Sequence, residues 1–316
     1  MKKILVIGSS NTDLIIKVPE IPRPGETVLG SEFQTFPGGK GANQAVAAAR
    51  AGGEVMFIAA VGDDSYGKEA LDRYKQEGIN CEDIKVCRGI PSGIAMISVS
   101  DKGENAISVA PGANLILTPE DLDEAEEAFD EAGLLLIQLE IQMDTVGKAI
   151  EMCEELDTKV ILNPAPAASL PDRILQRTDI ITPNESEAER LTGIRIRNEK
   201  SAGKAAALLH RKGVGTVIIT MGARGAFLSD PSRKIRKMIP GYAVNAVDTT
   251  AAGDVFNGQL AVALSEDRSL EHAIGLAHAA AALSIQKTGA QSSIPTREET
   301  ENFYREHIPG GKTGRG

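Results

Sequence analysis

Residues 248–254 read Asp-Thr-Thr-Ala-Ala-Gly-Asp and lead directly into an apolar stretch that contains Val255 and Phe256. This order predicts a turn of small residues that opens a helix, with Asp254 at the opening. Helix openings expose unpaired N–H groups and the positive end of the helix dipole, so they attract anions. A carboxylate beside an anion site is expected where a hydroxyl must lose its proton while it attacks a phosphate. The alternative interpretation is an ordinary Asp cap after a glycine turn.

A second segment, far upstream, also places small residues before a helical pattern. Residues 38–44 read Gly-Gly-Lys-Gly-Ala-Asn-Gln. The segment is not a Walker A loop, because Gly41 follows Lys40 where Ser or Thr is required, and Gln34 stands where the first glycine belongs. It is not the pattern G-x-G-x-x-G either, because Gln44 occupies the third glycine position, which argues against a dehydrogenase. By itself, the segment is also compatible with a tight turn onto a closely packed helix.

Together the two segments resemble the signatures of the ribokinase-like carbohydrate kinases, and further motifs in the family's order extend the resemblance from Ile4 to about Phe303. These motifs are Asn11-Thr12-Asp13, Gln138-Leu139-Glu140, Asn163-Pro164-Ala165, the run from Thr182 to Glu187, and the run from Thr220 to Gly225. Each motif alone is a weak signal, whereas the ordered set is specific. Many family members carry Gly where this chain has Ala251, a small residue that the family pattern also accepts.

Short apolar runs alternate with amphipathic helical patterns along most of the chain. The expected strands lie at 4–7, 55–61, 134–138, 159–162, 180–182 and 217–220, and the expected helices at 40–50, 65–77, 119–129, 143–156 and 202–212. This order predicts an α/β fold with a mostly parallel sheet and helices on both faces. Ligands of such sheets bind beyond the carboxyl ends of the strands, where Asn11, Glu140 and Asn184 fall.

Residues 11–36 and 92–110 break this alternation, because each contains two extended runs separated by a turn. The resemblance implies that the two hairpins join into a small β-sheet lid over the sugar site. The kinase domain would then comprise residues 1–10, 37–91 and 111–308. A four-stranded sheet alone exposes an apolar face, so we expect a homodimer in which two lids cover each other. The Gly-rich, basic tail at 309–316 is expected to be disordered.

The signature at 248–254 carries the expected chemistry. Asp254 is the expected general base, which accepts the proton of the sugar's primary hydroxyl. The backbone of Ala251, Ala252, Gly253 and Asp254 is expected to form an anion hole, in which the last three N–H groups cradle the transferring phosphoryl group.

Short polar side chains that can pair with sugar hydroxyls stand in the other motifs. Carboxylates accept two hydrogen bonds from neighbouring hydroxyls, amides both donate and accept, and an ammonium group donates. The expected sugar-binding residues are Asn11, Asp13, Lys40, Asn43 and Glu140, together with Asp254. The resemblance adds the backbone of Gly39 and Gly41. Considered alone, Asp13 is also typical of a turn residue after a strand.

The resemblance also implies a site for ATP and Mg²⁺. Asn184 would contact the nucleotide phosphates and Glu187 would orient Mg²⁺ through water, although the same pair is typical of a helix cap. The nucleotide-binding turn would consist of Thr220, Gly222, Ala223, Arg224 and Gly225, with Gly253 beside the phosphates. His278 lies among small residues, so it is either a packed core residue or, as the resemblance implies, a neighbour of the adenine.

A potassium site beside the anion hole is a further implication of the resemblance. Its ligands would be oxygens, mostly of the backbone, as a hard cation prefers. The matching positions are Asp248, Thr250, Ser284, Lys287, Gly289 and Ser293.

The activity that the resemblance implies is ATP-dependent phosphorylation of D-ribose at its 5-hydroxyl, giving ribose 5-phosphate and ADP. The alternatives are a kinase for another small sugar or nucleoside, such as deoxyribose, adenosine or fructose, and a non-catalytic sugar sensor. A sensor is expected to lose Asp254 or Gly253, and both are present.

Composition narrows the partners further. The chain has 316 residues with a net charge of −10 and 3% aromatic residues, which argues against a general nucleic-acid or anionic-membrane surface. Three cysteines without a C-x-x-C pair favour a reduced, cytoplasmic protein. The apolar run near the N-terminus is too short for a signal peptide, and we find no stretch of about 18 apolar residues that could span a membrane.

Overall fold

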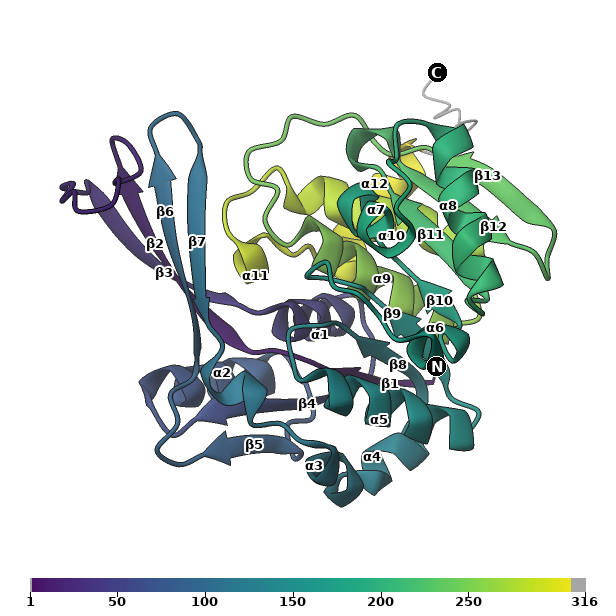
Figure 1. Cartoon of the computed structure of the whole chain (residues 1–316), viewed down its shortest axis with the longest axis horizontal. Coiled ribbons are helices and arrows are strands. Elements are labelled where there is room, and N and C mark those ends of the chain that lie inside the picture. Colours follow the sequence, from purple (N-terminus) through teal and green to yellow (C-terminus); the bar gives the residue numbers. More distant parts are fainter. Residues whose placement is uncertain (1, 308–316) are drawn as a thin grey trace.

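The computed structural model describes residues 2–307, and the tail expected at 309–316 lies outside the described residues. Its main element is a nine-stranded sheet with the order β13-β12-β11-β10-β9-β8-β1-β4-β5 (Figure 1). The strands are β1 (Lys3–Ile7), β4 (Val55–Gly62), β5 (Ile84–Cys87), β8 (Ala132–Ile137), β9 (Lys159–Leu162), β10 (Ile180–Ile181), β11 (Thr216–Thr220), β12 (Ala226–Asp230) and β13 (Ile235–Ile239). Pairing is parallel from β5 to β11 and antiparallel for β12 and β13. The predicted fold class is confirmed.

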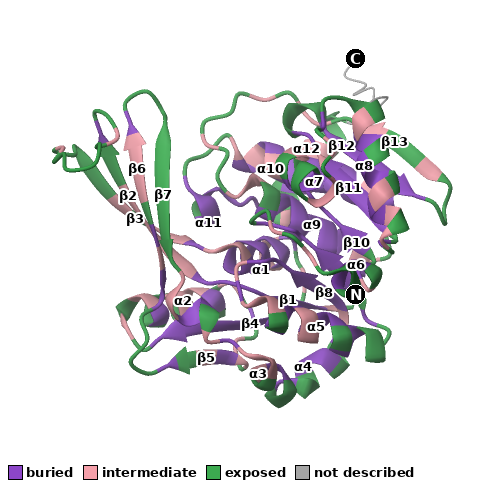
Figure 2. Ribbon diagram, in the orientation of Figure 1, coloured by how far each residue is buried: buried purple, intermediate pink, exposed green. Residues whose placement is uncertain are grey.

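Helices cover both faces of this sheet, as the unbroken apolar strands require. In β1, Leu5 and Ile7 join one core cluster and Ile4 and Val6 join the other, because successive side chains point to opposite faces. The first cluster is closed by α3 (Pro119–Glu124), α4 (Glu126–Glu131), α5 (Met143–Glu155), α6 (Asp172–Gln176), α7 (Glu185–Thr192) and α8 (Glu199–Arg211). The second is closed by α1 (Lys40–Arg50), α2 (Ser65–Gln76), α9 (Ala252–Ser265), α10 (Leu270–Ser284) and α12 (Arg297–His307). Figure 2 shows the buried strands between these layers.

Close packing of α1 positions the upstream signature. A Cβ added to Gly41 would lie 2.5 Å from the carbonyl carbon of Gly8, so α1 begins directly against the end of β1. A Cβ added to Gly258 of α9 would lie 2.5 Å from the Cβ of Ala47. The small residues of both helices therefore let α1 and α9 pack closely against each other.

Local differences from the predicted elements have physical causes. The helix expected at 119–129 starts as predicted, with a capping box between Thr118 and Asp121, but it is broken at Ala125, whose φ of −100° and ψ of 25° are not helical. Strands β5, β12 and β13 were not predicted. Strands β5 and β13 lie at the edges of the sheet, and β13 is half exposed, so both lack the unbroken apolar runs of the central strands. Strand β12 is buried, but its apolar run is short, because Ser229 and Asp230 follow Leu228.

A separate four-stranded sheet projects from one end of the molecule (Figure 1). Its order is β3-β2-β6-β7, formed by β2 (Asn11–Val18), β3 (Glu32–Gly38), β6 (Gly93–Ser100) and β7 (Asn105–Ala110). The two predicted hairpins are present, joined by parallel pairing of β2 with β6. Strand β3 extends two residues beyond the expected lid boundary at residue 36.

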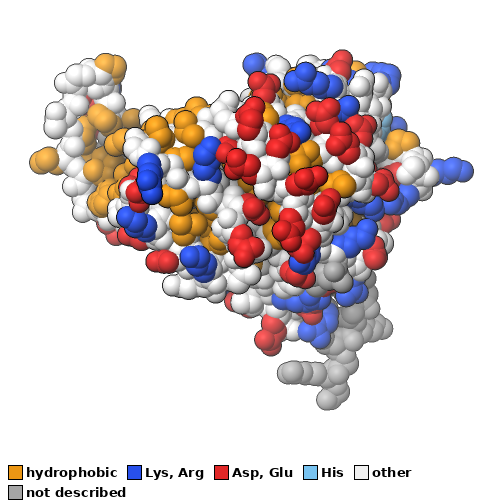
Figure 3. Space-filling model, turned by 90° about the horizontal axis from the view of Figure 1, so that it is seen from below, with side chains coloured by type: hydrophobic (Ala, Val, Ile, Leu, Met, Phe, Trp, Pro, Cys, Tyr) orange, Lys and Arg blue, Asp and Glu red, His pale blue; other side chains and the backbone are white. Residues whose placement is uncertain are grey.

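The lid sheet carries exposed apolar side chains. Leu14 pairs with Met96 and Ile16 with Phe33, which places these four on one face, and Phe33 and Met96 are 63% and 64% exposed. Hydrophobic side chains gather over this end of the molecule in Figure 3. Among residues 2–307, no helix has the length and apolar character needed to cross a membrane.

Candidate active site

The predicted catalytic carboxylate lies at the opening of α9. Ala251 precedes the helix with a left-handed φ of 60°, and Asp254 follows in the first turn with 6% of its surface exposed. The N–H of Ala252 donates to the carbonyl of Thr249 at 3.3 Å. A Cβ added to Gly253 would have no neighbour within 4 Å, so the backbone there is open to an approaching group.

Two amides from α1 hold the carboxylate of Asp254. Asn43 Nδ2 donates to Oδ2 and Gln44 Nε2 donates to Oδ1, each at 3.0 Å. Burial raises the pKa of Asp254, while Lys40 and the two amide donors favour the charged form. The carboxylate is therefore oriented on both oxygens. Gln44 received no role from the sequence, although it closes the quoted Gly-rich segment.

Glu140 joins the same cluster through the loop after β8. It accepts hydrogen bonds from Ser9 Oγ at 2.5 Å and from the backbone N–H of Lys40 at 3.0 Å. Its second oxygen lies 3.8 Å from Lys40 Nζ. Burial alone would lower the pKa of Lys40, but the negative charges of Asp254 and Glu140 outweigh it and raise that pKa. The lysine is therefore positively charged.

Asp13 faces this cluster from the lid strand β2. A Cβ added to Gly38, at the end of β3, would lie 2.3 Å from Asp13 Oδ1, so glycine there makes room for the carboxylate. Burial, followed by the charges of Glu140 and Asp254, raises the pKa of Asp13 to about 6. The neighbouring Asn11 accepts a hydrogen bond on Oδ1 from Asn114 Nδ2 at 2.7 Å. Neutral hydroxyl groups suit this crowded set of carboxylates, because each hydroxyl donates a hydrogen bond to a carboxylate oxygen.

Gly39 and Gly41 shape the backbone beneath these side chains. Gly39 has a φ of 88°, and a Cβ there would lie 2.7 Å from the N atom of Asn11. The loop therefore passes close to the start of β2, which brings the lid residues and α1 to one edge of the sheet.

Asn184 and Glu187 form a capping box at the start of α7. Asn184 Oδ1 accepts from the N–H of Glu187 at 2.9 Å, and Glu187 Oε2 accepts from the N–H of Asn184 at 2.8 Å. The cap that the sequence left as an alternative is present. Burial raises the pKa of Glu187, and the positive charge of Lys40 and the negative charge of Asp254 also act on it. The pair is therefore close enough to the Asp254 cluster to share its electrostatics.

An open groove of about 880 Å³ lies beside the opening of α9. Its walls include Gly222, Ala223, Thr249, Ala252 and His278. The side chain of Arg224 is directed elsewhere, because it donates to the carbonyl of Arg197 at 2.7 Å and pairs with Glu185. Thr220 ends β11, and Gly225 adopts a φ of 90° against the backbone of Ile239.

His278 belongs to the buried wall of this groove. Burial lowers its pKa to about 4, so the imidazole is neutral at pH 7. Nδ1 lies 3.2 Å from the carbonyl of Pro240, which assigns the proton to Nδ1. Within the part of the chain that the structure describes, Nε2 is buried without a hydrogen-bond partner. It is thus a free acceptor.

The residues expected to bind potassium are brought together in part. Asp248 accepts on Oδ1 from the N–H of Thr250 and on Oδ2 from the N–H of Gly289, both at 2.9 Å. This ties the signature loop to α11 (Ala290–Ser293). Ser284 and Ser293 are each 1% exposed. The side chain of Lys287 points away toward Glu299, at 3.3 Å.

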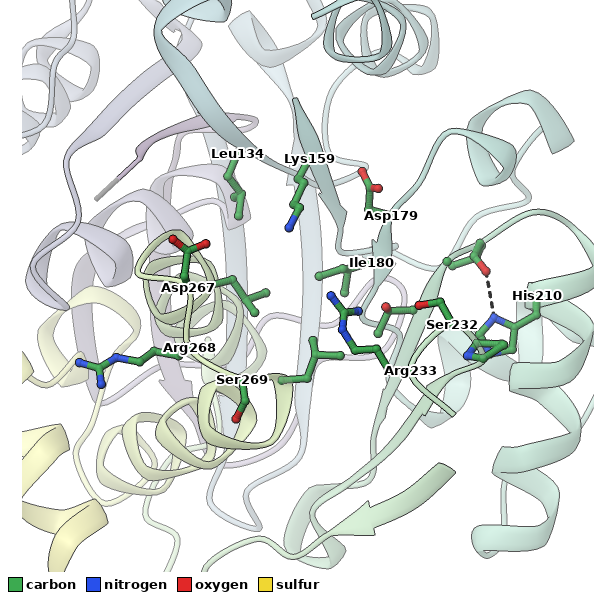
Figure 4. Close-up of a pocket in the computed structure, with 16 residues that line it drawn as sticks. Leu134, Lys159, Asp179, Ile180, His210, Ser232, Arg233, Asp267, Arg268 and Ser269 are labelled. Carbon is green, nitrogen blue, oxygen red and sulfur yellow. Dashed lines mark hydrogen bonds between the residues drawn. The ribbon is translucent and has the colours of Figure 1, made fainter. Parts of the chain in front are cut away.

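A second hollow, of about 780 Å³, lies at the opposite, amino-terminal ends of the strands. Figure 4 shows Lys159 and Arg233 extending into it, with His210 in one wall. None of the site residues expected from the sequence lines this hollow. The chemistry-bearing motifs therefore converge at the carboxyl ends of the strands alone.

Comparison with known proteins agrees with this geometry. The model of the pfkB family carbohydrate kinases matches residues 1–297. A ribokinase of Haemophilus influenzae is 47% identical over 302 residues, covering 96% of this chain and 98% of that protein. A ribokinase of Bacillus subtilis is 42% identical over 303 residues, covering 96% and 99%. The solved structure of Arabidopsis thaliana ribokinase complexed with ribose and ATP superposes with a TM-score of 0.90 at 32% identity, covering 96% and 99%. The chain belongs to the pfkB family of carbohydrate kinases.

Proposed function

We propose that the protein transfers the γ-phosphoryl group of ATP to the 5-hydroxyl of D-ribose, giving ribose 5-phosphate and ADP. The observation that carries this proposal is the buried Asp254, held at the opening of α9 beside a cluster of carboxylates and amides. The similarity to ribokinases over almost the whole chain supports ribose as the acceptor.

Asp254 is the proposed general base. Each of its oxygens accepts one amide hydrogen and has a second lone pair for the ribose hydroxyl. The pKa raised by burial brings the carboxylate closer to the basicity needed at neutral pH. Such assistance is typically worth about 10²–10⁴ in rate.

The N–H groups of Ala252, Gly253 and Asp254 are the proposed anion hole, with Ala251 turning the chain into the helix. The open space at Gly253 supports a close approach of phosphate. The bond from the N–H of Ala252 to Thr249 must lengthen for that donor to take part. Donors preorganised in this way stabilise the charge that develops in the transition state.

We assign the sugar pocket to side chains from three elements. Asp13 and Asn11 come from the lid, Lys40 and Asn43 from α1, and Glu140 from the loop after β8. The backbone of Gly39 and Gly41 completes the pocket floor. Because these groups belong to both the lid and the main body, ribose would draw the two together and exclude water from the phosphoryl group.

The groove lined by His278 is the proposed adenine site, with Thr220 and the turn at 222–225 beside it. Asn184 would contact the phosphates. Glu187 has both oxygens engaged by Asn184, so it fits a Mg²⁺ ion held through water rather than directly. When bound with ATP, Mg²⁺ offsets the charge of the phosphates.

A potassium ion is proposed beside the anion hole, held by oxygens of Asp248, Thr250, Ser284, Lys287, Gly289 and Ser293. The donor set fits a hard cation. The link from Asp248 to both Thr250 and Gly289 supports this, because it brings the two backbone segments together.

We also propose a cytoplasmic homodimer. The exposed side chains Phe33 and Met96 give each lid an apolar face that a second lid would cover. Residues 11–36 and 92–110 would act as the lid of this dimer. The free side chains of Cys81, Cys87 and Cys153 suit a reducing compartment.

The proposed function is tested by ADP release from Mg-ATP with ribose, deoxyribose, fructose, fructose 6-phosphate and adenosine. Ribose should give the highest kcat/KM, and Asp254→Asn should lower kcat by about 10²–10⁴. A clear preference for another acceptor would overturn the substrate and leave the chemistry in place. A lack of turnover with every acceptor would count against the kinase itself and favour a sugar-binding protein.

A further inference from the structure

The carboxylate of Asp254 and three buried amide side chains form a continuous hydrogen-bonded relay. Gln44 Nε2 donates to Asp254 Oδ1 and to Asn163 Oδ1, each at 3.0 Å. Gln44 Oε1 accepts from Gln138 Nε2 at 2.6 Å. Gln44 and Gln138 are fully buried, and Asn163 is 6% exposed. The relay joins α1, α9 and the ends of β8 and β9.

The direction of every amide in this relay follows from one backbone group. The carbonyl of Thr182 can only accept, so it takes a hydrogen from Asn163 Nδ2, at 3.2 Å. Asn163 must then turn Oδ1 toward Gln44, which in turn presents Nε2 to both Asn163 and Asp254. The polarity of the relay is thus set by the strand-end backbone.

Gln44 has no donor left for a ligand. Both hydrogens of Nε2 are used, one by Asn163 and one by Asp254. Asn43, which holds the other oxygen of Asp254, accepts from Gln291 Nε2 at 3.2 Å and keeps one amide hydrogen free. Gln44 therefore acts on Asp254 and not on the sugar.

Packing alone does not explain a glutamine at this position. Apart from Asn43 and Gln44, every buried residue of α1 is Gly, Ala or Val. A buried amide is costly unless its hydrogen bonds are made, and an apolar side chain of similar size would fill the space without that requirement. The polar amide of Gln44 is therefore explained by the hydrogen bond that its Nε2 donates to the Asp254 carboxylate.

We propose that Gln44 is a positioning residue, which holds the Asp254 carboxylate in the orientation that accepts the proton of the sugar hydroxyl, and that Asn163 and Gln138 fix Gln44 in turn. The proposal rests on the assignment of Asp254 as general base under the proposed function. It gives a role to three side chains, Gln44, Asn163 and Gln138, for which the sequence motifs supplied none.

The test compares Gln44→Met with the wild-type enzyme in ribose phosphorylation between pH 5.5 and 9. We expect kcat to fall by about 10- to 100-fold, by analogy with partners that orient metal-ligating side chains, with the KM for ribose changed less than about threefold. Loss of a donor to the charged carboxylate raises the pKa of Asp254, so the acidic limb of the kcat/KM profile moves up by about one pH unit. Gln259→Met is the matched control, because Gln259 is a buried glutamine of α9 that lines a separate cavity.

Two further variants protect the test from a folding defect. Gln44→Glu is almost isosteric. It places a second carboxylate beside Asp254, which should also move the acidic limb of the kcat/KM profile to higher pH. The double variant Asn163→Leu with Gln44→Met should have the same kcat as Gln44→Met alone, because both substitutions act through the contact between Gln44 and Asp254. Additive losses would contradict the relay.

A readout that needs no turnover separates this proposal from the proposed function. In protein with carbon-13-labelled aspartate, the Asp254 carboxyl signal is assigned by its loss in Asp254→Asn, and its titration should shift upward in Gln44→Met. An inactive wild-type protein would count against the function only. Unchanged kcat, pH profile and Asp254 titration in a folded Gln44→Met would overturn the positioning role, as would a raised ribose KM at unchanged kcat.

Discussion

Asp13→Asn should make the unliganded protein more stable, and increasingly so as the pH rises. Burial and the negative charges of Glu140 and Asp254 raise the pKa of Asp13 from 3.8 to about 6 in the folded state. The unfolded chain ionises more readily, so ionisation of Asp13 opposes folding. Below about pH 3 the side chain is neutral in both states and contributes nothing. Above about pH 6 the full penalty is present.

The size of the effect follows from the two pKa values. Their separation of about two units corresponds to about 3 kcal/mol in the free energy of unfolding at pH 8. At pH 5 only about half of that penalty has developed. The advantage of Asp13→Asn over the wild type should therefore grow by about 1.5 kcal/mol between pH 5 and pH 8.

Urea unfolding at several pH values, without ribose, measures this difference. Asp72→Asn, an exposed carboxylate on α2, is the matched control for the loss of one negative charge. Ribose should raise the unfolding midpoint of the wild type and leave that of Asp13→Asn almost unchanged. A stability difference that stays constant with pH, or that narrows toward pH 8, would refute the electrostatic account of Asp13.

Asp254→Asn should lower kcat by about 10²–10⁴ and retain binding of ribose and ATP, as measured by calorimetry; retained turnover would exclude Asp254 as base. Gly253→Ala should be as stable as the wild type or up to about 1 kcal/mol more stable, because no atom lies within 4 Å of the added methyl group, yet it should lose turnover. Replacement of potassium by sodium should lower kcat, and Asp248→Asn should weaken this preference for potassium. Equal rates of the wild type in both salts would contradict the proposed cation site. Phe33→Glu with Met96→Glu should convert a dimer to a monomer in sedimentation, and an unchanged mass would place the interface elsewhere.

Much of the fold could be predicted because its elements have strong local signals. The helix expected at 40–50 matches α1 in both bounds, and the strand expected at 159–162 matches β9. Both begin or end at residues with a clear local preference, such as Gly39 before α1. The prediction of one continuous helix at 119–129 was wrong at Ala125, where the structure divides it into α3 and α4. Nothing in the sequence indicated this break, because alanine favours helix.

The candidate site could be predicted only as a set of separate positions. Asp13, Glu140 and Asp254 stand in motifs that the resemblance connects, but no local pattern reveals the distances between them. Gln44 was noted in the Gly-rich segment, but no function could be assigned to it from the sequence. Its hydrogen-bond partners are distant in the chain, so no local pattern identifies them.

The sequence by itself determined the alternation of strands and helices, the two hairpins and the opening of α9, because these depend on neighbouring residues, apolar periodicity and turn chemistry. Only the tertiary structure decided that Asn43 and Gln44 hold Asp254, more than 200 positions away, and that burial and nearby charges raise the pKa of Asp13 to about 6. Hydrogen bonds and pKa values depend on burial and on charges that meet through space. The close packing of α1 against β1 and α9 brings those groups together.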